Sequence, residues 1–195
     1  MGSYISVGFI YDKISIDNIK NKMKSLIDFI VSKKGEIKRA KICKDIYGDE
    51  WIEYELNDNT QIDNMLVLLA EHYFGQIEIE TNLFDLMNLD ITVHVEKEEG
   101  YFGFILDISE SAFYKDSLNM VNSYTDKFID LMKKFYKCSA YNYAFCDNEA
   151  EIKYSPLAFR NLNKRVYSLA ILPVHNNNLR VIKSEWNIDG ITNRN

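Results

Sequence analysis

The chain opens with a strand pattern that is followed by a helix pattern. Residues 4–11 are rich in β-branched and aromatic side chains and are apolar on both faces, which predicts an interior strand. Ser15 or Asp17 can cap the helix that follows, and Gly35 offers a stop. The apolar positions of this helix recur at helical spacing: Ile19, Met23, Leu26, Ile27 and Ile30. Residues 36–45 alternate weakly among lysines, which is typical of a strand near a sheet edge.

The middle of the chain combines a helix with strands that have one wet face. A short strand is predicted at residues 51–56, and a helix at about 61–74 is apolar nearly all round, so it should be buried. Three further strands are predicted at residues 76–81, 89–96 and 101–108. The first two alternate apolar and polar residues, whereas the third is apolar on both sides. Glu98, Glu99 and Gly100 make the turn that joins the last two strands as a hairpin.

A third helix and three strands complete the pattern. The helix runs from about Asp116 to Lys137, with Asp116 or Ser117 as its cap and lysines at the negative end of its dipole. Its apolar stripe consists of Val121, Tyr124, Phe128, Leu131, Met132 and Phe135. Strands are predicted at residues 140–145, 167–174 and 179–186, and residues 191–195 should form a frayed tail.

These elements predict one α+β domain over residues 1–190. Strands joined as hairpins and interrupted by helices favour a mixed, mainly antiparallel sheet with about three helices packed on one face. Hydrophobic residues make up 47% of the 195 positions, which is ample for a packed core. Only two prolines and eight glycines are present, and no linker rich in serine, proline or glycine divides the chain.

Cysteine usage and the absence of targeting segments predict a cytoplasmic protein without a membrane partner. Cys43, Cys138 and Cys146 cannot all pair within one chain, and none belongs to a Cys-x-x-Cys unit. The first residues lack the basic start and the apolar stretch of a signal peptide. The longest aliphatic run, residues 65–70, is too short to cross a bilayer. A reducing compartment fits this pattern.

Charge is distributed unevenly along the chain. Residues 51–113 carry fourteen Asp and Glu against a single cation, Lys97, while the segments on either side are net positive. Like charges that face each other across strands cost stability, so folding alone does not explain such a cluster. A basic partner would relieve that cost and would be steered towards the acidic surface. The simpler alternative is that these carboxylates form an ordinary solvated surface.

The strand alternation selects the carboxylates that should face a partner. They are Glu78, Glu80, Asp90, Glu96, Glu98 and Glu99. A second acidic set, Asp147, Glu149 and Glu151, follows the predicted strand at 140–145 at alternate positions. This set could extend the acidic patch, bind a cation, or belong to a solvated turn.

Catalytic motifs are absent from the sequence, so no catalytic, metal-binding or cofactor-binding residue is assigned. His72, His94 and His175 are far apart, and no glycine-rich phosphate loop or nucleophile motif occurs. The nearest hint is Glu-x-Lys, half of a motif of metal-dependent nucleases, at residues 36–38 and 151–153. A nuclease-like or other enzyme is therefore the alternative, and a small-ligand or oligomerisation module is a third class. No nucleic-acid partner is predicted, because basic residues form only one weak track.

Two segments, together with length and overall character, suggest a family. Residues 2–8 and 143–151 resemble those of the small acidic α+β immunity proteins of bacterial polymorphic-toxin systems. The resemblance implies a cytoplasmic inhibitor that occludes the active site of a cognate toxin. Since it supplies no binding residue, the charge pattern alone indicates the site, and we expect a basic toxin domain as the partner.

Overall fold

The computed structural model describes residues 3–45, 47–55, 59–113, 123–175 and 178–189, and its centre is one nine-stranded sheet. The strands are β1 (Tyr4–Asp12), β2 (Glu36–Cys43), β3 (Trp51–Glu55), β4 (Phe74–Leu83), β5 (Leu86–Glu98), β6 (Tyr101–Ser109), β7 (Tyr143–Asn148), β8 (Leu169–Pro173) and β9 (Leu179–Lys183). Their order across the sheet is β3-β2-β4-β5-β6-β1-β7-β8-β9, and every pairing is antiparallel. The predicted α+β class with a mainly antiparallel sheet is confirmed, and all the described strand pairings are antiparallel.

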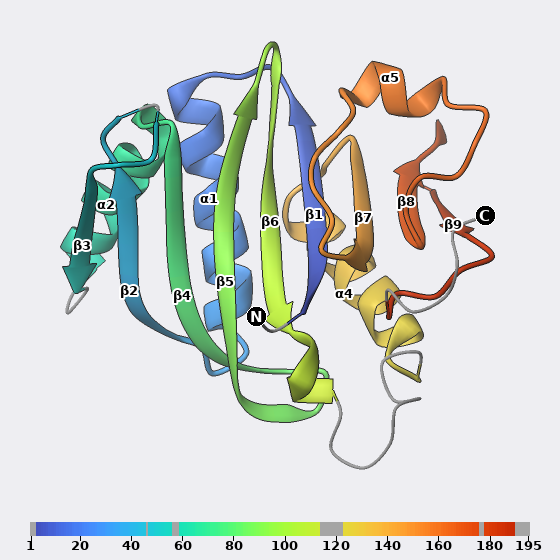
Figure 1. The fold of residues 1–195 in the computed structure, drawn as a ribbon, viewed down its shortest axis with the longest axis horizontal. Helices are drawn as coiled ribbons and strands as arrows, with labels where there is room; N and C mark the ends of the chain where they lie inside the picture. The colour runs from blue at the N-terminus through green and yellow to red at the C-terminus, as the bar shows by residue number, and fades with distance from the viewer. Residues whose placement is uncertain (1–2, 46, 56–58, 114–122, 176–177, 190–195) are drawn as a thin grey trace.

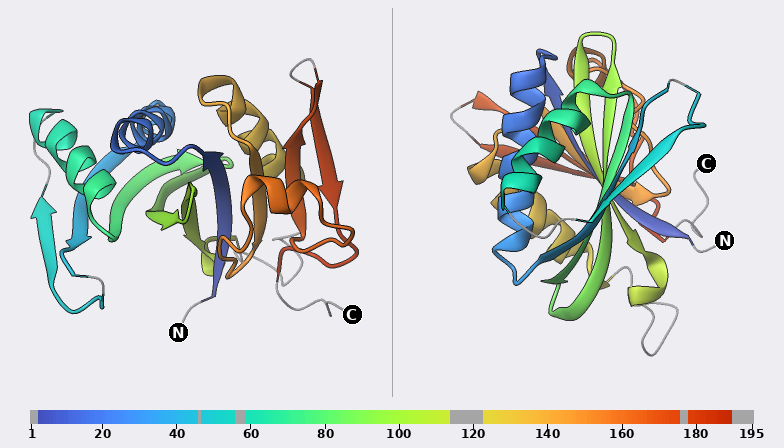
Figure 2. Two further views of the ribbon diagram at one scale, coloured as in Figure 1. Left: turned by 90° about the horizontal axis from the view of Figure 1, so that it is seen from above. Right: turned by 90° about the vertical axis from the view of Figure 1, so that its left-hand side faces the viewer.

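Helices cover the two faces of the sheet unequally. They are α1 (Ile16–Val31), α2 (Asn59–Glu71), the 3₁₀ turn η1 (Glu110–Phe113), α4 (Thr125–Cys138) and α5 (Pro156–Arg160). As Figures 1 and 2 show, α1, α2 and α4 lie on one side of the sheet. The short α5 packs on the opposite side, through Phe159, which the sequence did not indicate.

The main hydrophobic core lies between the sheet and the three longer helices. The α1 helix buries its five predicted positions, and its predicted cap Ser15 accepts a hydrogen bond from the backbone N–H of Asn18 at 3.2 Å. On β5 the alternation is also confirmed, because Ile91, Val93 and Val95 are buried in this core. The first strand, β1, lies between β6 and β7 and is buried on both faces, as an interior strand should be.

Several element boundaries differ from the prediction, most clearly at the second helix and at the strand predicted at 140–145. The second helix ends at Glu71, and Phe74 begins β4 instead of closing the helix. This helix is also not buried all round, because Gln61 and Asp63 are exposed on the side that faces away from the sheet. The strand predicted at 140–145 starts later, at Tyr143. The cap predicted at 116–117, Val121 and the tail at 191–195 lie outside the described residues.

A smaller hydrophobic cluster occupies part of the opposite face. Residues 149–167, here called the covering segment, cross this face and pack Phe159 and Tyr167 on Phe145 and on its neighbours in β1, β6 and β7. The ring of Phe145 stacks on Tyr167 with 4.0 Å between centroids. Gly8 makes room for this stack, because a Cβ at that position would lie 2.2 Å from Cε1 of Phe145. A glycine inside β1 is therefore a packing requirement of this cluster.

The structure also shows the state of the cysteines and the character of the helices. The three cysteines are free thiols, with Cys43 and Cys146 buried and Cys138 exposed. Within the described ranges, no helix has the length and apolar character needed to span a membrane.

Candidate functional site

The face of the sheet opposite the three long helices is only half covered. The covering segment packs on β6, β1 and β7, whereas the outward side chains of β3, β2, β4 and β5 lie beyond it. We call this second region the open face. Figure 1 views the sheet from this side, with α1 behind the strands and the four strands of the open face in the left half of the picture.

Strand register arranges the open face in rows. Residues that pair directly across antiparallel strands point to the same side, so each row runs across the sheet. In order from β3 to β5, the rows are Trp51–Cys43–Phe74–Glu96, Glu53–Lys41–Gln76–His94, Glu55–Arg39–Glu78–Thr92 and, on the last three strands, Glu36–Glu80–Asp90. The face is thus aromatic in its first row and charged in the others.

The structure brings most of the predicted partner-binding carboxylates together. Five of the six lie on the open face: Glu78, Glu80, Asp90, Glu96 and Glu98. Glu80 is directly opposite Asp90, so the two carboxylates are close neighbours. Glu98 and Glu99 are exposed at the β5–β6 hairpin, about 26 Å along the strand from Asp90 at 3.3 Å per residue. Glu96 is about 20 Å from Asp90 by the same rise, so the compact group consists of Glu78, Glu80 and Asp90.

Cations from outside the acidic segment reach two of these carboxylates. Arg39 donates from Nε to Glu78 at 2.6 Å, and Lys38 lies 3.8 Å from Glu80. Both cations belong to β2, which the fold inserts between β3 and β4. The charge count along the chain missed them because β2 lies in the positive first segment of the sequence. The pairs stabilise the folded state little, because water screens exposed ion pairs.

The open face remains negative after this neutralisation. Its carboxylates are Glu36, Glu53, Glu55, Glu78, Glu80, Asp90, Glu96 and Glu98. Against them stand three cations, Lys38, Arg39 and Lys41. Within the described part of the chain, no cation forms an ion pair with Asp90, Glu55 or Glu98. These carboxylates can accept a cation from a partner without first losing one of the protein's own.

Glu96 lies in a less polar setting than the other carboxylates. It lines a shallow pocket of about 260 Å³ where the open face meets the covering segment, together with Asp107, Glu149 and Glu151. Burial raises the pKa of Glu96 to about 6, and the charges of Glu151 and Asp107 act in the same direction. A hydrogen bond from the backbone of Ile152 opposes this rise. The ionised form of Glu96 is therefore destabilised in the absence of a cationic partner.

His94, Asp107 and Ser6 form a hydrogen-bonded group beside Glu96. The Nε2 atom of His94 lies 3.1 Å from Oδ2 of Asp107, and Ser6 donates its hydroxyl to Oδ1 of Asp107 at 2.6 Å. His94 is partly buried here. The serine contacts the aspartate and not the histidine, so the group lacks the arrangement that activates a serine nucleophile.

The second acidic set contains one buried carboxylate, Asp147, and two exposed ones, Glu149 and Glu151. Asp147 is fully buried, and it accepts hydrogen bonds from the hydroxyl of Ser168 at 2.6 Å and from Nε1 of Trp186 at 3.4 Å. It holds β7 to the C-terminal part of the chain and is inaccessible to a partner. Glu149 and Glu151, in contrast, are exposed at the rim of the pocket that contains Glu96.

The nuclease alternative finds no support in the arrangement of the Glu-x-Lys units. Each glutamate faces the lysine of its own unit, with 2.9 Å between Glu36 and Lys38 and 3.8 Å between Glu151 and Lys153. Across the described ranges, no group of three or more His, Cys, Asp or Glu residues is placed to hold a metal ion.

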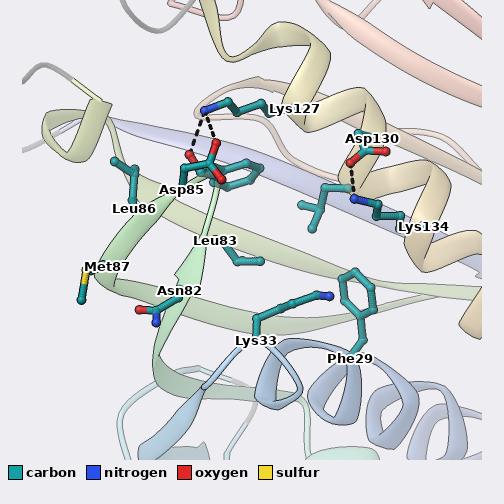
Figure 3. A pocket seen from close by; sticks show the side chains of 12 residues that line it. Phe29, Lys33, Asn82, Leu83, Asp85, Leu86, Met87, Lys127, Asp130 and Lys134 are labelled. Atoms are coloured by element: carbon teal, nitrogen blue, oxygen red, sulfur yellow. Dashed lines mark hydrogen bonds and ion pairs between the residues drawn. The ribbon is translucent and has the colours of Figure 1, made fainter.

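Another pocket lies on the helix side of the sheet. It measures about 420 Å³ and lies between the end of α1, the β4–β5 turn and α4 (Figure 3). Three lysines line it, and two of them are paired: Lys127 with Asp85 at 2.9 Å and Lys134 with Asp130 at 2.6 Å. The pocket thus carries mixed charge and, among its lining residues, no pairing of a nucleophile with a base.

Comparisons with known proteins place the chain in a family. Residues 1–194 match the family described as Immunity protein 64, and immunity proteins are typically non-enzymatic. A chain from the crystal structure of the toxic C-terminal tip of CdiA from Pseudomonas aeruginosa in complex with immune protein is similar over 76% of this chain and 88% of its own, with 15% identity and a TM-score of 0.46. The Pseudomonas aeruginosa T6SS protein PA0821 is similar over 75% of this chain and 41% of its own, with 5% identity and a TM-score of 0.36. The curated proteins contain no match.

The family match confirms the resemblance seen in the sequence, and it does so over nearly every residue of the chain. The chain belongs to the Immunity protein 64 family, and it is an immunity protein that neutralises a cognate toxin.

Proposed function

We propose that the protein neutralises its toxin in the cytoplasm by laying the open face over a basic surface of the toxin domain. The observation that carries the proposal is the net negative, uncovered half of the sheet. A basic surface near an active site is typical of nucleases, because they must attract phosphates. Occlusion of such a surface by carboxylates would exclude the substrate. The binding residues are those of the open face, Glu98 included, together with Glu99 at the hairpin.

The ion pairs within the open face are compatible with binding. The carboxylates of Glu78 and Glu80 face arginine and lysine side chains that are partly exposed to solvent. Such pairs exchange partners at little cost, because each ion is already solvated. Electrostatic attraction between oppositely charged faces raises the association rate, and salt reduces that rate.

The test measures association with the toxin domain encoded by the neighbouring gene. The variant carries Glu80→Lys and Asp90→Lys, which reverse two adjacent charges on the open face. The control carries Asp63→Lys and Glu71→Lys, which make the same change in net charge on the exposed surface of α2, at the other side of the sheet. Rates are measured by stopped flow at low and at high salt, and circular dichroism verifies that both variants are folded.

We expect the open-face variant to associate at least tenfold more slowly than the control at low salt, and with a weaker dependence on salt. In cells that express the toxin, the open-face variant should also protect less well than the control. Equal association rates and equal salt dependence in the two variants would refute the open face as the binding surface. Failure of the native protein to bind the toxin domain would refute the proposal as a whole.

A further inference from the structure

Two exposed aromatic side chains stand at the end of the open face. Trp51 begins β3 and Phe74 begins β4, and both pair with Cys43 of β2, which is fully buried between them. The fractions exposed are 45% for Trp51 and 46% for Phe74. Because directly paired residues share a side of the sheet, the two rings lie on either side of the thiol on the open face. Neither ring belongs to the hydrophobic clusters of the fold.

The indole of Trp51 is held in place before any partner arrives. Its Nε1 atom donates to the carbonyl of Gly48 at 2.8 Å. The loop that carries Gly48 is fixed by Asp45, which accepts hydrogen bonds from the backbone N–H groups of Glu50 at 2.6 Å and Tyr47 at 2.7 Å. These hydrogen bonds lower the pKa of Asp45 to about 2, and the one from Glu50 contributes most. The carboxylate therefore stays ionised. A ring that is already oriented loses little freedom on binding.

Charge surrounds the aromatic pair on two sides. Glu53 follows Trp51 on the same side of β3, with Lys41 3.1 Å away, and Glu96 lies one position beyond the Gly75–Val95 pair, where the register continues to Phe74. A ligand that covers the rings therefore meets apolar surface at its centre and carboxylates at its margin. A long side chain with an apolar stem and a positive head satisfies both requirements, and arginine does so best because its guanidinium also stacks on aromatic faces.

We propose that Trp51 and Phe74 form the apolar anchor of the toxin-binding surface, and that an arginine-bearing segment of the toxin domain occupies it. The inference rests on the proposed function, because the occupant is the toxin. Interfaces concentrate their affinity in a few buried aromatic residues with a polar rim, and the end row of the open face has this composition. The carboxylates of the other rows then determine how fast the toxin arrives, and the aromatic row determines how long it stays.

The first experiment measures the binding of purified variants to the toxin domain by biolayer interferometry. Trp51→Ala and Phe74→Ala remove the anchor one ring at a time. Met87→Ala and Leu157→Ala are matched controls, because these apolar side chains are 74% and 72% exposed, at the start of β5 and on α5. We expect each anchor variant to bind at least thirtyfold more weakly, mainly through faster dissociation, while the controls stay within threefold of the native protein.

A second measurement uses the native sequence, because an alanine variant could bind more weakly only through a loss of folding stability. The chain has two tryptophans, Trp51 and Trp186. With 5-fluorotryptophan incorporated into the immunity protein alone, the two ¹⁹F resonances are assigned with Trp51→Phe, and unlabelled toxin domain is then added. The Trp51 resonance should shift and lose its solvent isotope effect, whereas that of Trp186 should stay in place.

Each outcome bears on one proposal at a time. Toxin binding that leaves the Trp51 resonance unchanged, or anchor variants that bind like the controls, would overturn the anchor and leave the immunity function standing. If instead the anchor variants lose affinity while the Glu80 and Asp90 reversals change nothing, the anchor stands and the electrostatic part of the proposed function falls.

Discussion

Replacement of Glu96 by glutamine should stabilise the folded protein above about pH 6 and should have little effect below pH 4.5. Burial raises the pKa of this carboxyl from its ordinary value of 4.5 to about 6 in the folded state. As pH rises through this window, the unfolded chain releases the proton first, so folding stability is lost between pH 4.5 and 6. Each pKa unit corresponds to 1.36 kcal/mol, and with allowance for partial solvation we expect a difference of about 1–2 kcal/mol.

Chemical denaturation at pH 4, 5, 6 and 8 provides the assay. Glutamine can still accept the hydrogen bond from Ile152, so Glu96→Gln isolates the charge. Glu98→Gln is the control, because it removes the same charge from an exposed position on the same strand and should change stability by less than about 0.5 kcal/mol at every pH. If Glu96→Gln raises the free energy of unfolding equally at pH 4 and pH 8, the loss of stability does not come from ionisation of the buried carboxylate, and the reasoning is refuted.

Two further substitutions test how the covering segment is held. Gly8→Ala should cost about 1–3 kcal/mol of folding stability, because the new Cβ meets the Phe145 ring, and addition of Phe145→Leu should recover part of the loss in chemical denaturation. Strictly additive losses would show that the two residues do not meet. Asp147→Ala should cost about 1–3 kcal/mol, since it removes the buried acceptor of the Ser168 backbone N–H and one of the two acceptors near the Ser168 hydroxyl, and thermal unfolding measures this. A weaker toxin affinity at unchanged stability would place Asp147 in the interface instead.

Local sequence patterns determined much of the sheet and its helices. The spacing of apolar residues selected the five buried positions of α1, and the alternation along β5 separated the core side chains Ile91 and Val93 from the outward Asp90 and His94. Such patterns are reliable because a helix or a strand fixes which neighbours along the chain share a face. The same rule placed Glu78, Glu80, Asp90 and Glu96 on the outward side before any pairing was known.

The second helix shows where local patterns stop being sufficient. Its apolar residues continue past the end of the helix, so the run of hydrophobic positions extended the prediction to Phe74. In the folded chain Phe74 begins a strand, because pairing with β2 and β5 outweighs helical preference at that point. Gly8 is a second case in which local preference is insufficient. Glycine has a low propensity for strands, and its presence in β1 is explained only by the Phe145 ring, which occupies the space that a Cβ would need.

The sequence by itself determined the fold class, the outward carboxylates and the family resemblance, because each depends on residue type and on short-range periodicity. The tertiary structure alone decided which residues became neighbours. Insertion of β2 between β3 and β4 brought Arg39 to Glu78 and placed Trp51 and Phe74 on either side of Cys43. Strand order is set by contacts between distant parts of the chain, and no local pattern encodes those contacts.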